Sequence, residues 1–313
     1  MASSYPAPFI ISPTPPNTHQ TTLILLHGTS TTGPEFASSF LSFPFPQPQP
    51  KTNTPITLQQ ALPNTKFVFP TGKLRKTTVF GGRETNAWFD VSDFGDRTIG
   101  EDAMRGGIRE SIVYLTGIVE DEVKLLEPKS ECDEDGQGRG DRSGRVVLGG
   151  FSQGSAMGVM LILSRMLEAR GLAADIGGFT GLSGWCPFRL GLEESIFSGI
   201  LDGDASIEEG YEGRREKAAS YLRQLIDIRI DGNEEEGCQG ESLLDKKIFL
   251  AHGKEDAKMK IEWGAQMRDL LKTLGGDVWW EAYVGLGHWY GEEEMKDLVS
   301  FLEGVWGGTA IRE

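Results

Sequence analysis

Short apolar runs, rich in β-branched residues and bounded by glycine or proline, recur along the chain. They occupy residues 21–28, 66–72, 145–152, 176–184, 247–253 and 278–287. Nearly continuous apolarity over so few residues is typical of strands that are buried on both faces of a parallel sheet, whereas a strand with one wet face alternates apolar and polar residues. The pattern therefore predicts a mostly parallel central sheet.

Stretches with helical periodicity separate these runs. They lie near residues 101–127, 154–170, 213–229, 258–275 and 291–305. Strands that alternate with helices predict an α/β fold, in which a doubly wound sheet carries helices on both faces. We expect a single domain of this class over residues 21–308.

Four segments interrupt this rhythm. Residues 1–20 predict a flexible leader, and the proline-rich residues 41–55 predict an extended surface loop, because proline neither continues a helix nor donates to a central ladder. The acidic residues 128–145 predict a solvated insertion. Residues 188–246 contain an amphipathic helix pattern with two interpretations: a surface helix packed on the domain, or a lid, since this insertion follows a strand and opens on the ligand-binding edge.

The net charge of −15 argues against nucleic acid as a partner, because phosphate binding needs a concentrated basic surface and the densest basic stretch is only residues 73–76. An anionic membrane surface would repel the chain, and no run approaches the roughly 18 apolar residues of a membrane span. Three scattered cysteines without metal-ligand spacing, and a start unlike a secretory signal, favour a cytoplasmic setting. We expect no metal site, and the oligomeric state stays open.

The candidate chemistry centres on Gly150-Phe151-Ser152-Gln153-Gly154, which lies between an apolar strand and an apolar helix. With 41 glycines in the chain, a chance G-x-S-x-G is common, so the context has to decide. Glycines suit both flanks of a serine on a sharp strand-to-helix turn, because a Cβ there would meet the neighbouring strand or helix. An α/β-hydrolase supports such a serine with an acid and then a histidine further along the chain.

The base can be selected among four histidines by position. His19 lies in the leader, while His27 and His252 each follow a strand directly and precede glycine, where a buried structural role is commoner. His288 stands on the loop after the last predicted strand and before the last predicted helix, which is where this fold delivers its base. We therefore expect His288 to be the general base.

The acid follows from the same reasoning about sheet edges. Asp256 occupies the loop after the strand that precedes the last one, so strand ends would bring it to the edge where the serine and histidine lie. Asp277 and Asp245 lie before strands and hence at the opposite edge. Glu255 is the nearest alternative to Asp256.

Acyl transfer through a serine also needs two N–H donors for the oxyanion. One should be the backbone amide of Gln153, next after the nucleophile. The other comes from the loop after an early strand, where Thr29 is the best candidate.

Several of these segments, in this order, together resemble the acyl-protein thioesterase/phospholipase-carboxylesterase family. The resemblance covers most of the chain from about residue 21 to 305 and leaves out the leader and the long insertions. Its motifs are "LLHGT", "FPTGK", "NAWFDV", "GGFSQGSA", "GLSGWCPF", "AHGKEDAKM" and "GLGHWY".

The resemblance implies an α/β-hydrolase fold and a serine hydrolase that acts on thioesters and oxyesters of fatty acids without a cofactor. Position by position, it assigns Ser152 as nucleophile, Asp256 as acid and His288 as base, with the backbone amides of Thr29 and Gln153 as the oxyanion hole. The partner it implies is an acylated protein, or a lipid or small-ester substrate.

The resemblance also suggests aromatic residues for the substrate pocket. It places Trp88 and Asp90 in a segment that borders the pocket, although Asp90 equally fits a structural role. Phe151, Trp185 and Trp289 are the other pocket candidates, and for aromatic residues next to strands a place in the core is the default.

The chain departs from the family at some positions, and alternatives stay open. Ser155 stands where relatives generally have a second glycine, and the insertion after "GWCPF" is much longer, which leaves the substrate size open. One alternative is a lysophospholipase or small-ester carboxylesterase. Another, of a different class, is a hydrolase-fold protein that binds a ligand or partner without turnover.

Overall fold

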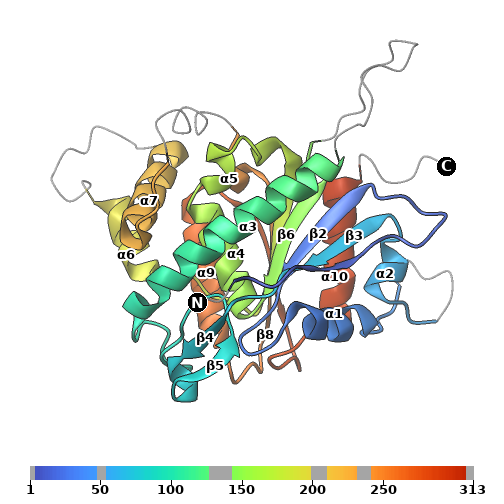
Figure 1. Ribbon diagram of the computed structural model, residues 1–313, viewed down its shortest axis with the longest axis horizontal. Coiled ribbons are helices and arrows are strands. Elements are labelled where there is room, and N and C mark those ends of the chain that lie inside the picture. The colour runs from blue at the N-terminus through green and yellow to red at the C-terminus, as the bar shows by residue number, and fades with distance from the viewer. Residues whose placement is uncertain (1–3, 48–53, 127–142, 199–209, 231–240, 308–313) are drawn as a thin grey trace, which may run out of the picture.

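A seven-stranded sheet forms the centre of the protein in the order β1-β3-β2-β6-β7-β8-β9 (Figure 1). The computed structural model describes residues 4–47, 54–126, 143–198, 210–230 and 241–307. All neighbouring strands of this sheet pair in parallel except β1, which is antiparallel to β3. The strands are β1 (Phe9–Ile11), β2 (Thr21–Leu26), β3 (Thr65–Phe69), β6 (Val146–Phe151), β7 (Ile176–Leu182), β8 (Lys247–Gly253) and β9 (Asp277–Tyr283).

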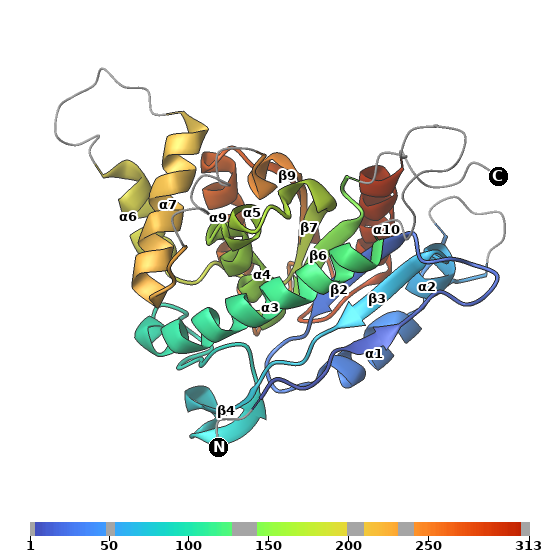
Figure 2. The ribbon, with the colours of Figure 1, turned by 45° about the horizontal axis from the view of Figure 1, so that its top comes forward.

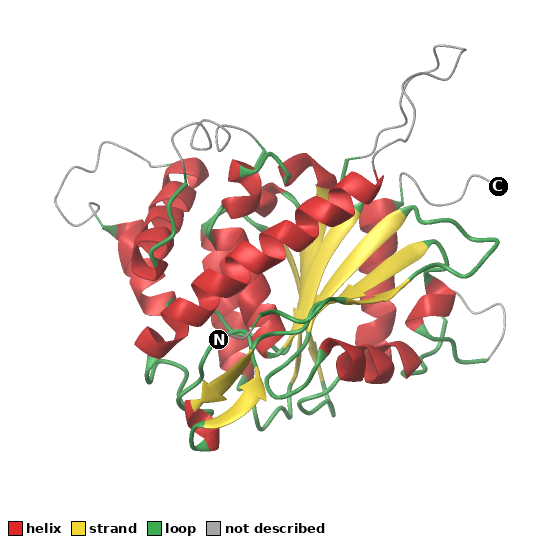
Figure 3. Ribbon diagram, in the orientation of Figure 1, coloured by secondary structure: helices red, strands yellow, loops and turns green. Residues whose placement is uncertain are grey.

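Helices cover both faces of the sheet, as the parallel, apolar strands require (Figures 2 and 3). Alternate residues of β2 show the division: Ile24 and Leu26 join the core under α3, α4, α7 and α9, while Leu23 and Leu25 join the core under α1, α2 and α10. The helices are α1 (Gly33–Ser42), α2 (Leu58–Ala61), α3 (Met104–Leu126), α4 (Gln153–Leu163), α5 (Met166–Ala169), α6 (Arg189–Phe197), α7 (Tyr211–Ile226), α9 (Ile261–Thr273) and α10 (Glu292–Trp306). The predicted fold class, a mostly parallel sheet between helices, is confirmed.

A small hairpin lies beside the carboxyl edge of the sheet. It pairs β4 (Leu74–Thr77) with β5 (Arg83–Asn86), and the 3₁₀ turn η1 (Thr78–Phe80) joins the two strands. A second 3₁₀ turn, η2 (Glu101–Ala103), leads into α3. The sequence pattern did not predict the hairpin, because its strands are short and polar.

The structure corrects the prediction of a flexible leader over residues 1–20 at Tyr5 and at residues 9–11. Phe9–Ile11 form the edge strand β1 on β3. The ring of Tyr5 stacks on Tyr114 with centroids 3.9 Å apart, and its hydroxyl lies 3.0 Å from that of Ser111. The three apolar residues pair with the open edge of β3. This long-range pairing could not be predicted from the local sequence, which is rich in proline.

The proline-rich residues 41–55 also depart from the predicted surface loop. Leu41 belongs to α1, and Phe45 is fully buried. The backbone of Phe45 exchanges two hydrogen bonds of 2.9 Å with that of Ile56. Residues 48–53 lie outside the described residues, so the prediction is corrected only for the start of this segment.

Residues 128–142 of the acidic insertion that was predicted over 128–145 lie outside the described residues. Within the part of the chain that the structure describes, no helix combines the length and apolarity needed to span a bilayer. In the same part, His, Cys, Asp and Glu side chains form no cluster of three or more that could hold a metal ion.

Candidate active site

Ser152 lies on the tight turn between β6 and α4. Its backbone has φ 55° and ψ −118°, a conformation that costs an ordinary residue on the order of 1–3 kcal/mol. Glycine is needed on both sides. A Cβ on Gly154 would overlap the carbonyl group of Leu26 on β2, and a Cβ on Gly150 would overlap the backbone of Gly154. The turn therefore holds the serine hydroxyl at the carboxyl edge of the sheet.

His288 and Asp256 reach the same edge from the loops after β9 and β8. The Nε2 atom of His288 lies 3.0 Å from Oγ of Ser152, and its Nδ1 atom lies 2.7 Å from Oδ2 of Asp256. An ionised carboxylate only accepts hydrogen bonds, so Nδ1 carries the ring proton and Nε2 accepts from the serine hydroxyl. The three side chains that were predicted from distant segments thus form one hydrogen-bonded row.

The carboxylate of Asp256 is held by amides as well as by the imidazole. Oδ1 accepts from the backbone N–H groups of Lys258 at 2.9 Å and Met259 at 2.8 Å. Burial raises the pKa of Asp256, but the hydrogen bonds from His288 and from these amides outweigh it, and the pKa lies below its ordinary value. The group is therefore ionised at neutral pH and can stabilise an imidazolium.

The alternative bases and acids have other partners. His252 donates from Nε2 to the carbonyl oxygen of Met259 at 2.8 Å, and Glu255 accepts from the amide of Gly285 at 2.6 Å. Asp277 begins β9 and so lies at the opposite edge of the sheet. None of these groups is part of the row at Ser152.

The loop after β2 brings Thr29 to the wall of the same site. The preceding His27 is fully buried. Its Nε2 atom accepts from the amide of Gly72 at 2.9 Å, so its Nδ1–H donates to the carbonyl of Gly28 at 2.6 Å. Burial lowers the pKa of His27 to about 4, which keeps the ring neutral. Gln153 is the first residue of α4, so its amide has no acceptor inside the helix.

The side chain of Gln153 connects the serine turn to the segment after β5. Its Oε1 atom accepts from the backbone N–H of Trp88 at 3.0 Å, and its Nε2 donates to the carbonyl of Phe89 at 2.8 Å. The indole N–H of Trp88 donates to the carbonyl of His27 at 2.8 Å. One buried network therefore fixes the serine turn, the Thr29 loop and residues 88–89 relative to one another.

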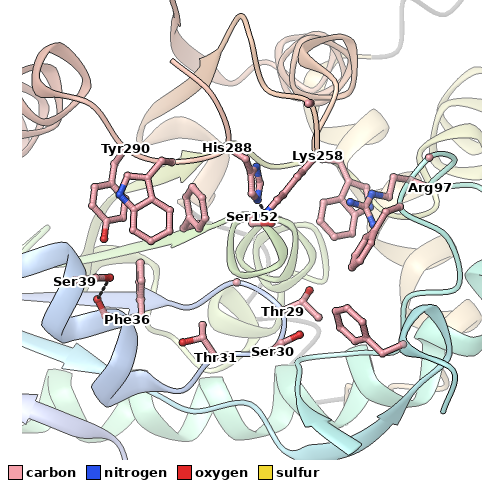
Figure 4. Close-up of a pocket in the computed structure, with 18 residues that line it drawn as sticks. Thr29, Ser30, Thr31, Phe36, Ser39, Arg97, Ser152, Lys258, His288 and Tyr290 are labelled. Atoms are coloured by element: carbon pink, nitrogen blue, oxygen red, sulfur yellow. Dashed lines mark hydrogen bonds between the residues drawn. The ribbon is translucent and has the colours of Figure 1, made fainter. Parts of the chain in front are cut away.

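A cavity of about 660 Å³ opens at Ser152 and His288 and extends to both sides of them (Figure 4). On one side lie Phe36 and Ser39 of α1 together with Tyr290, and on the other lies Arg97. We call these sides the apolar arm and the arginine arm. In the apolar arm, the ring of Phe151 contacts those of Phe36, Trp289 and Tyr290. In the arginine arm, Arg97 lies over the rings of Phe94 and Trp185, and Phe80 contacts Phe94. Lys258 also lines the cavity.

Three of the four predicted pocket residues line this cavity: Phe151, Trp185 and Trp289. The prediction for Trp88 is wrong, since the side chain is fully buried outside the lining and its indole N–H is used within the core. Asp90 has the structural role that was considered for it. Its carboxylate accepts from the amide and the hydroxyl of Thr78 and so fixes the turn of the hairpin.

Sequence reasoning missed the contribution of α1 to the site. A signal for this helix is present, because Thr32 and Glu35 form a capping box in which Oγ1 of Thr32 accepts from the amide of Glu35 at 3.4 Å. Pro34 also suits the first turn of a helix. Phe36 and Ser39 then follow from helical spacing. Arg97 and the hairpin residues carry no comparable signal.

The insertion at residues 188–246 does not cover the cavity in its described part. Its helices α6 and α7 pack on each other, and they contact α9 and the α3–α4 layer respectively. No described residue of the insertion belongs to the cavity lining. Of the two interpretations, the structure therefore agrees with a surface helix pair, and the β4–β5 hairpin borders the site instead.

The parallel sheet, the strained serine turn at its carboxyl edge and the order Ser, Asp, His along the chain define an α/β-hydrolase. The family model for Phospholipase/Carboxylesterase matches residues 6–199. The chain belongs to this family and is a serine hydrolase of the ester-cleaving class.

Among its relatives, acyl-protein thioesterase 1 of Gibberella zeae is 25% identical over 288 residues, which cover 91% of this chain and 90% of that protein. Acyl-protein thioesterase 1 of Mycosarcoma maydis is 26% identical over 257 residues, with 80% and 82% covered. The crystal structure of Zea mays acyl-protein thioesterase 2 matches with a TM-score of 0.58 and 21% identity, over 96% of this chain and 99% of that one. This structural likeness supports the fold.

Proposed function

We propose that the protein hydrolyses thioesters and oxyesters of fatty acids through Ser152, His288 and Asp256. The observation that carries the proposal is the row of two hydrogen bonds, 3.0 Å from Ser152 to His288 and 2.7 Å from His288 to Asp256. A serine hydroxyl is a weak nucleophile until a neighbouring base takes its proton, and this row supplies the base in the required tautomer.

The reaction has two halves. Oγ of Ser152 attacks the acyl carbonyl while Nε2 of His288 takes the hydroxyl proton, and Asp256 stabilises the imidazolium. His288 then gives this proton to the leaving thiol or alcohol, whose bond to the acyl carbon breaks. Water attacks the resulting acyl-enzyme in the same way and releases the acid. General-base assistance of this kind contributes about 10² to 10⁴ in rate.

Two backbone amides complete the proposed site. The N–H groups of Thr29 and Gln153 are the proposed oxyanion hole, which stabilises the negative oxygen of the tetrahedral intermediate. The position of Gln153 at the start of α4 supports its part, because helix N-termini favour negative charge. The His27 hydrogen bonds support that of Thr29, since they hold its loop in one position.

The apolar arm is the proposed site for the acyl chain. Phe36, Phe151, Trp289 and Tyr290 offer it aromatic surface, and each buried methylene is worth about 0.8 kcal/mol. The names of the relatives favour an acylated protein as the natural substrate. A lipid or a small ester is the alternative, and its cleavage would use the same chemistry.

Covalent labelling with a fluorophosphonate tests the nucleophile. Ser152→Ala should abolish the labelling and lower kcat by at least about 10³-fold, because the hydroxyl that forms the acyl-enzyme is missing. Ser39→Ala is the matched control, since Ser39 lines the same cavity but its hydroxyl donates to the carbonyl of Phe36. Labelling that persists in Ser152→Ala would overturn the assignment.

The substrate class needs a separate measurement. A series of nitrophenyl esters of increasing chain length should show kcat/KM rising with each methylene that the apolar arm accepts. An S-acylated peptide should be cleaved at least as well as the ester of the same acyl group. If only the shortest esters react, the enzyme is a small-ester carboxylesterase.

A further inference from the structure

Arg97 is a buried cation in the wall of the catalytic cavity. Its side chain comes from the segment between β5 and η2, and the residue is only 7% exposed. The guanidinium carbon lies 4.6 Å from the ring centre of Trp185, 4.9 Å from that of Phe94 and 5.4 Å from that of Trp263. Arg97 also lines a second, smaller cavity of about 170 Å³.

Among the described residues, the guanidinium lacks the carboxylate partner that a buried arginine normally has. Within the described part of the chain, no carboxylate oxygen lies within 4.0 Å of its nitrogens. One of its terminal nitrogens donates to the carbonyl of Asp93 at 3.2 Å, and the buried Nε–H has no hydrogen-bond partner among the described residues. Removing a cation from water costs several kcal/mol, and contacts with aromatic rings return only part of this.

Two lysines lie near Arg97. Lys258 lines the same cavity, and Lys260 lies 5.2 Å above the ring of Trp263. The carboxylates of Asp93 and Asp256 act on Arg97 from a distance, and Asp256 is already hydrogen-bonded to His288. Burial lowers the pKa of Arg97 to about 10, so the group is charged at neutral pH.

The second cavity adds one charge of each sign. The carboxylate of Glu101 accepts from the amide of Phe188 at 2.7 Å, and Arg189 lines the same cavity. In a chain with a net charge of −15, this wall is a local exception, because Arg97 has no carboxylate partner among the described residues and Lys258 lines the same cavity. An anionic ligand would be repelled by the protein as a whole and attracted at this point.

The two arms of the cavity indicate which part of the substrate would meet the positive charge of Arg97. An acyl carbonyl carries the acyl chain on one side and the leaving group on the other, and Figure 4 shows Phe36 and Tyr290 on one side of Ser152 and Arg97 on the other. We propose that Arg97 binds an oxyanion of the leaving group, so that the enzyme prefers esters and thioesters whose thiol or alcohol carries a carboxylate or a phosphate. This inference rests on the proposed function, which places the acyl chain in the apolar arm.

Arginine suits this role better than lysine would. Its planar fork of N–H donors matches carboxylate and phosphate oxygens in pairs, and it is more weakly hydrated than an ammonium group. The guanidinium lies over the rings of Trp185 and Phe94, which restrict its movement, so little side-chain entropy is lost on binding. Arg97 takes no part in the proton transfers and is a specificity residue.

Matched thioesters of one neutral acyl group test the proposal. One has 3-mercaptopropionate as the leaving thiol and the other the uncharged 3-mercaptopropionamide, which is nearly isosteric. The wild-type enzyme should show a kcat/KM about 10- to 100-fold higher for the carboxylate, mainly through KM, since hydrogen bonds to charged groups have this strength. A mercaptoethyl phosphate thioester then distinguishes phosphate from carboxylate as the preferred oxyanion.

Variants connect the preference to the residue. Arg97→Met should bring the ratio of kcat/KM for the carboxylate to that for the amide close to one, whereas Arg97→Lys should keep part of the preference. Lys272→Met, which removes an exposed cation from the end of α9, is the control and should behave like the wild type. Equal loss on both substrates in Arg97→Met would assign Arg97 a structural role and overturn the proposal.

Two further measurements keep the test decisive. If Arg97→Met does not fold, the wild-type enzyme decides. A ratio near one between its kcat/KM values for the carboxylate and the amide thioesters would contradict the proposal without any variant. A glutaryl thioester of a neutral thiol places the carboxylate on the acyl side, and a preference for it would contradict the leaving-group assignment. Binding of 3-mercaptopropionate to Ser152→Ala, followed by tryptophan fluorescence, needs no turnover and so separates this inference from the proposed function.

Discussion

The side chain of Gln153 allows a test of what holds the serine turn in place. It is fully buried and makes hydrogen bonds with the amide of Trp88 at 3.0 Å and with the carbonyl of Phe89 at 2.8 Å. Gln153→Met keeps the length and nearly the volume of the side chain, so the cavity term is small. It removes both hydrogen bonds and leaves two backbone groups buried without these partners.

The magnitude follows from these two groups. A buried donor or acceptor that loses its partner costs about 1–3 kcal/mol, so the free energy of unfolding should fall by about 2–6 kcal/mol. The backbone amide of Gln153, the proposed oxyanion donor, is unchanged by the substitution. The folded fraction of the variant should therefore still be labelled by a fluorophosphonate at Ser152.

Urea unfolding followed by tryptophan fluorescence gives the free energy, and its slope with denaturant should stay the same. Gln60→Met is the matched control, because the exposed Gln60 side chain accepts from the amide of Thr57 at 2.9 Å in a helix cap. Loss of this hydrogen bond should lower the free energy of unfolding by about 1 kcal/mol. A Gln153→Met variant that loses no more than this control would refute the idea that the network fixes the serine turn.

Two further changes test the backbone and the electrostatics. Gly154→Ala should destabilise the protein by about 3 kcal/mol or more, because the added Cβ meets the backbone of Leu26. Gly117→Ala on α3 is the control and should stabilise it by about 0.5–1 kcal/mol, because a Cβ there meets nothing. Thermal unfolding of both variants checks this, and equal shifts of Tm would contradict the packing argument. Burial raises the pKa of Glu294 to about 8, so between about pH 4.5 and 8 the unfolded chain binds fewer protons and stability falls as pH rises. Glu294→Gln should remove this slope in urea unfolding at pH 5 and pH 8, and a slope that persists would assign it to other groups.

Sequence reasoning predicted the elements whose pattern is local and strong. The runs at β2, β6 and β8 are largely apolar and lie beside glycines, so their burial could be inferred. Strand β1 could not, because three apolar residues become a strand only through pairing with β3. The β4–β5 hairpin was missed for a similar reason, since neither strand buries a continuous apolar surface.

In the candidate site too, some residues could be predicted from the sequence and others could not. Ser152, Asp256 and His288 each follow a strand, and the carboxyl ends of parallel strands meet at one edge, so topology alone predicts their convergence. The pocket depends on how side chains pack, and this is where Trp88 was misplaced. Arg97 was not singled out, because its burial between aromatic rings has no periodicity in the sequence.

The strained backbone conformation of Ser152 affects how the enzyme loses its activity. Its φ of 55° is maintained by the packing and the hydrogen bonds of the segments around it, and a looser turn would let the residue return to an ordinary backbone conformation. That relaxation lowers the local energy while it moves the hydroxyl away from the imidazole. Heat, denaturant or distant substitutions should therefore abolish the activity before they unfold the protein.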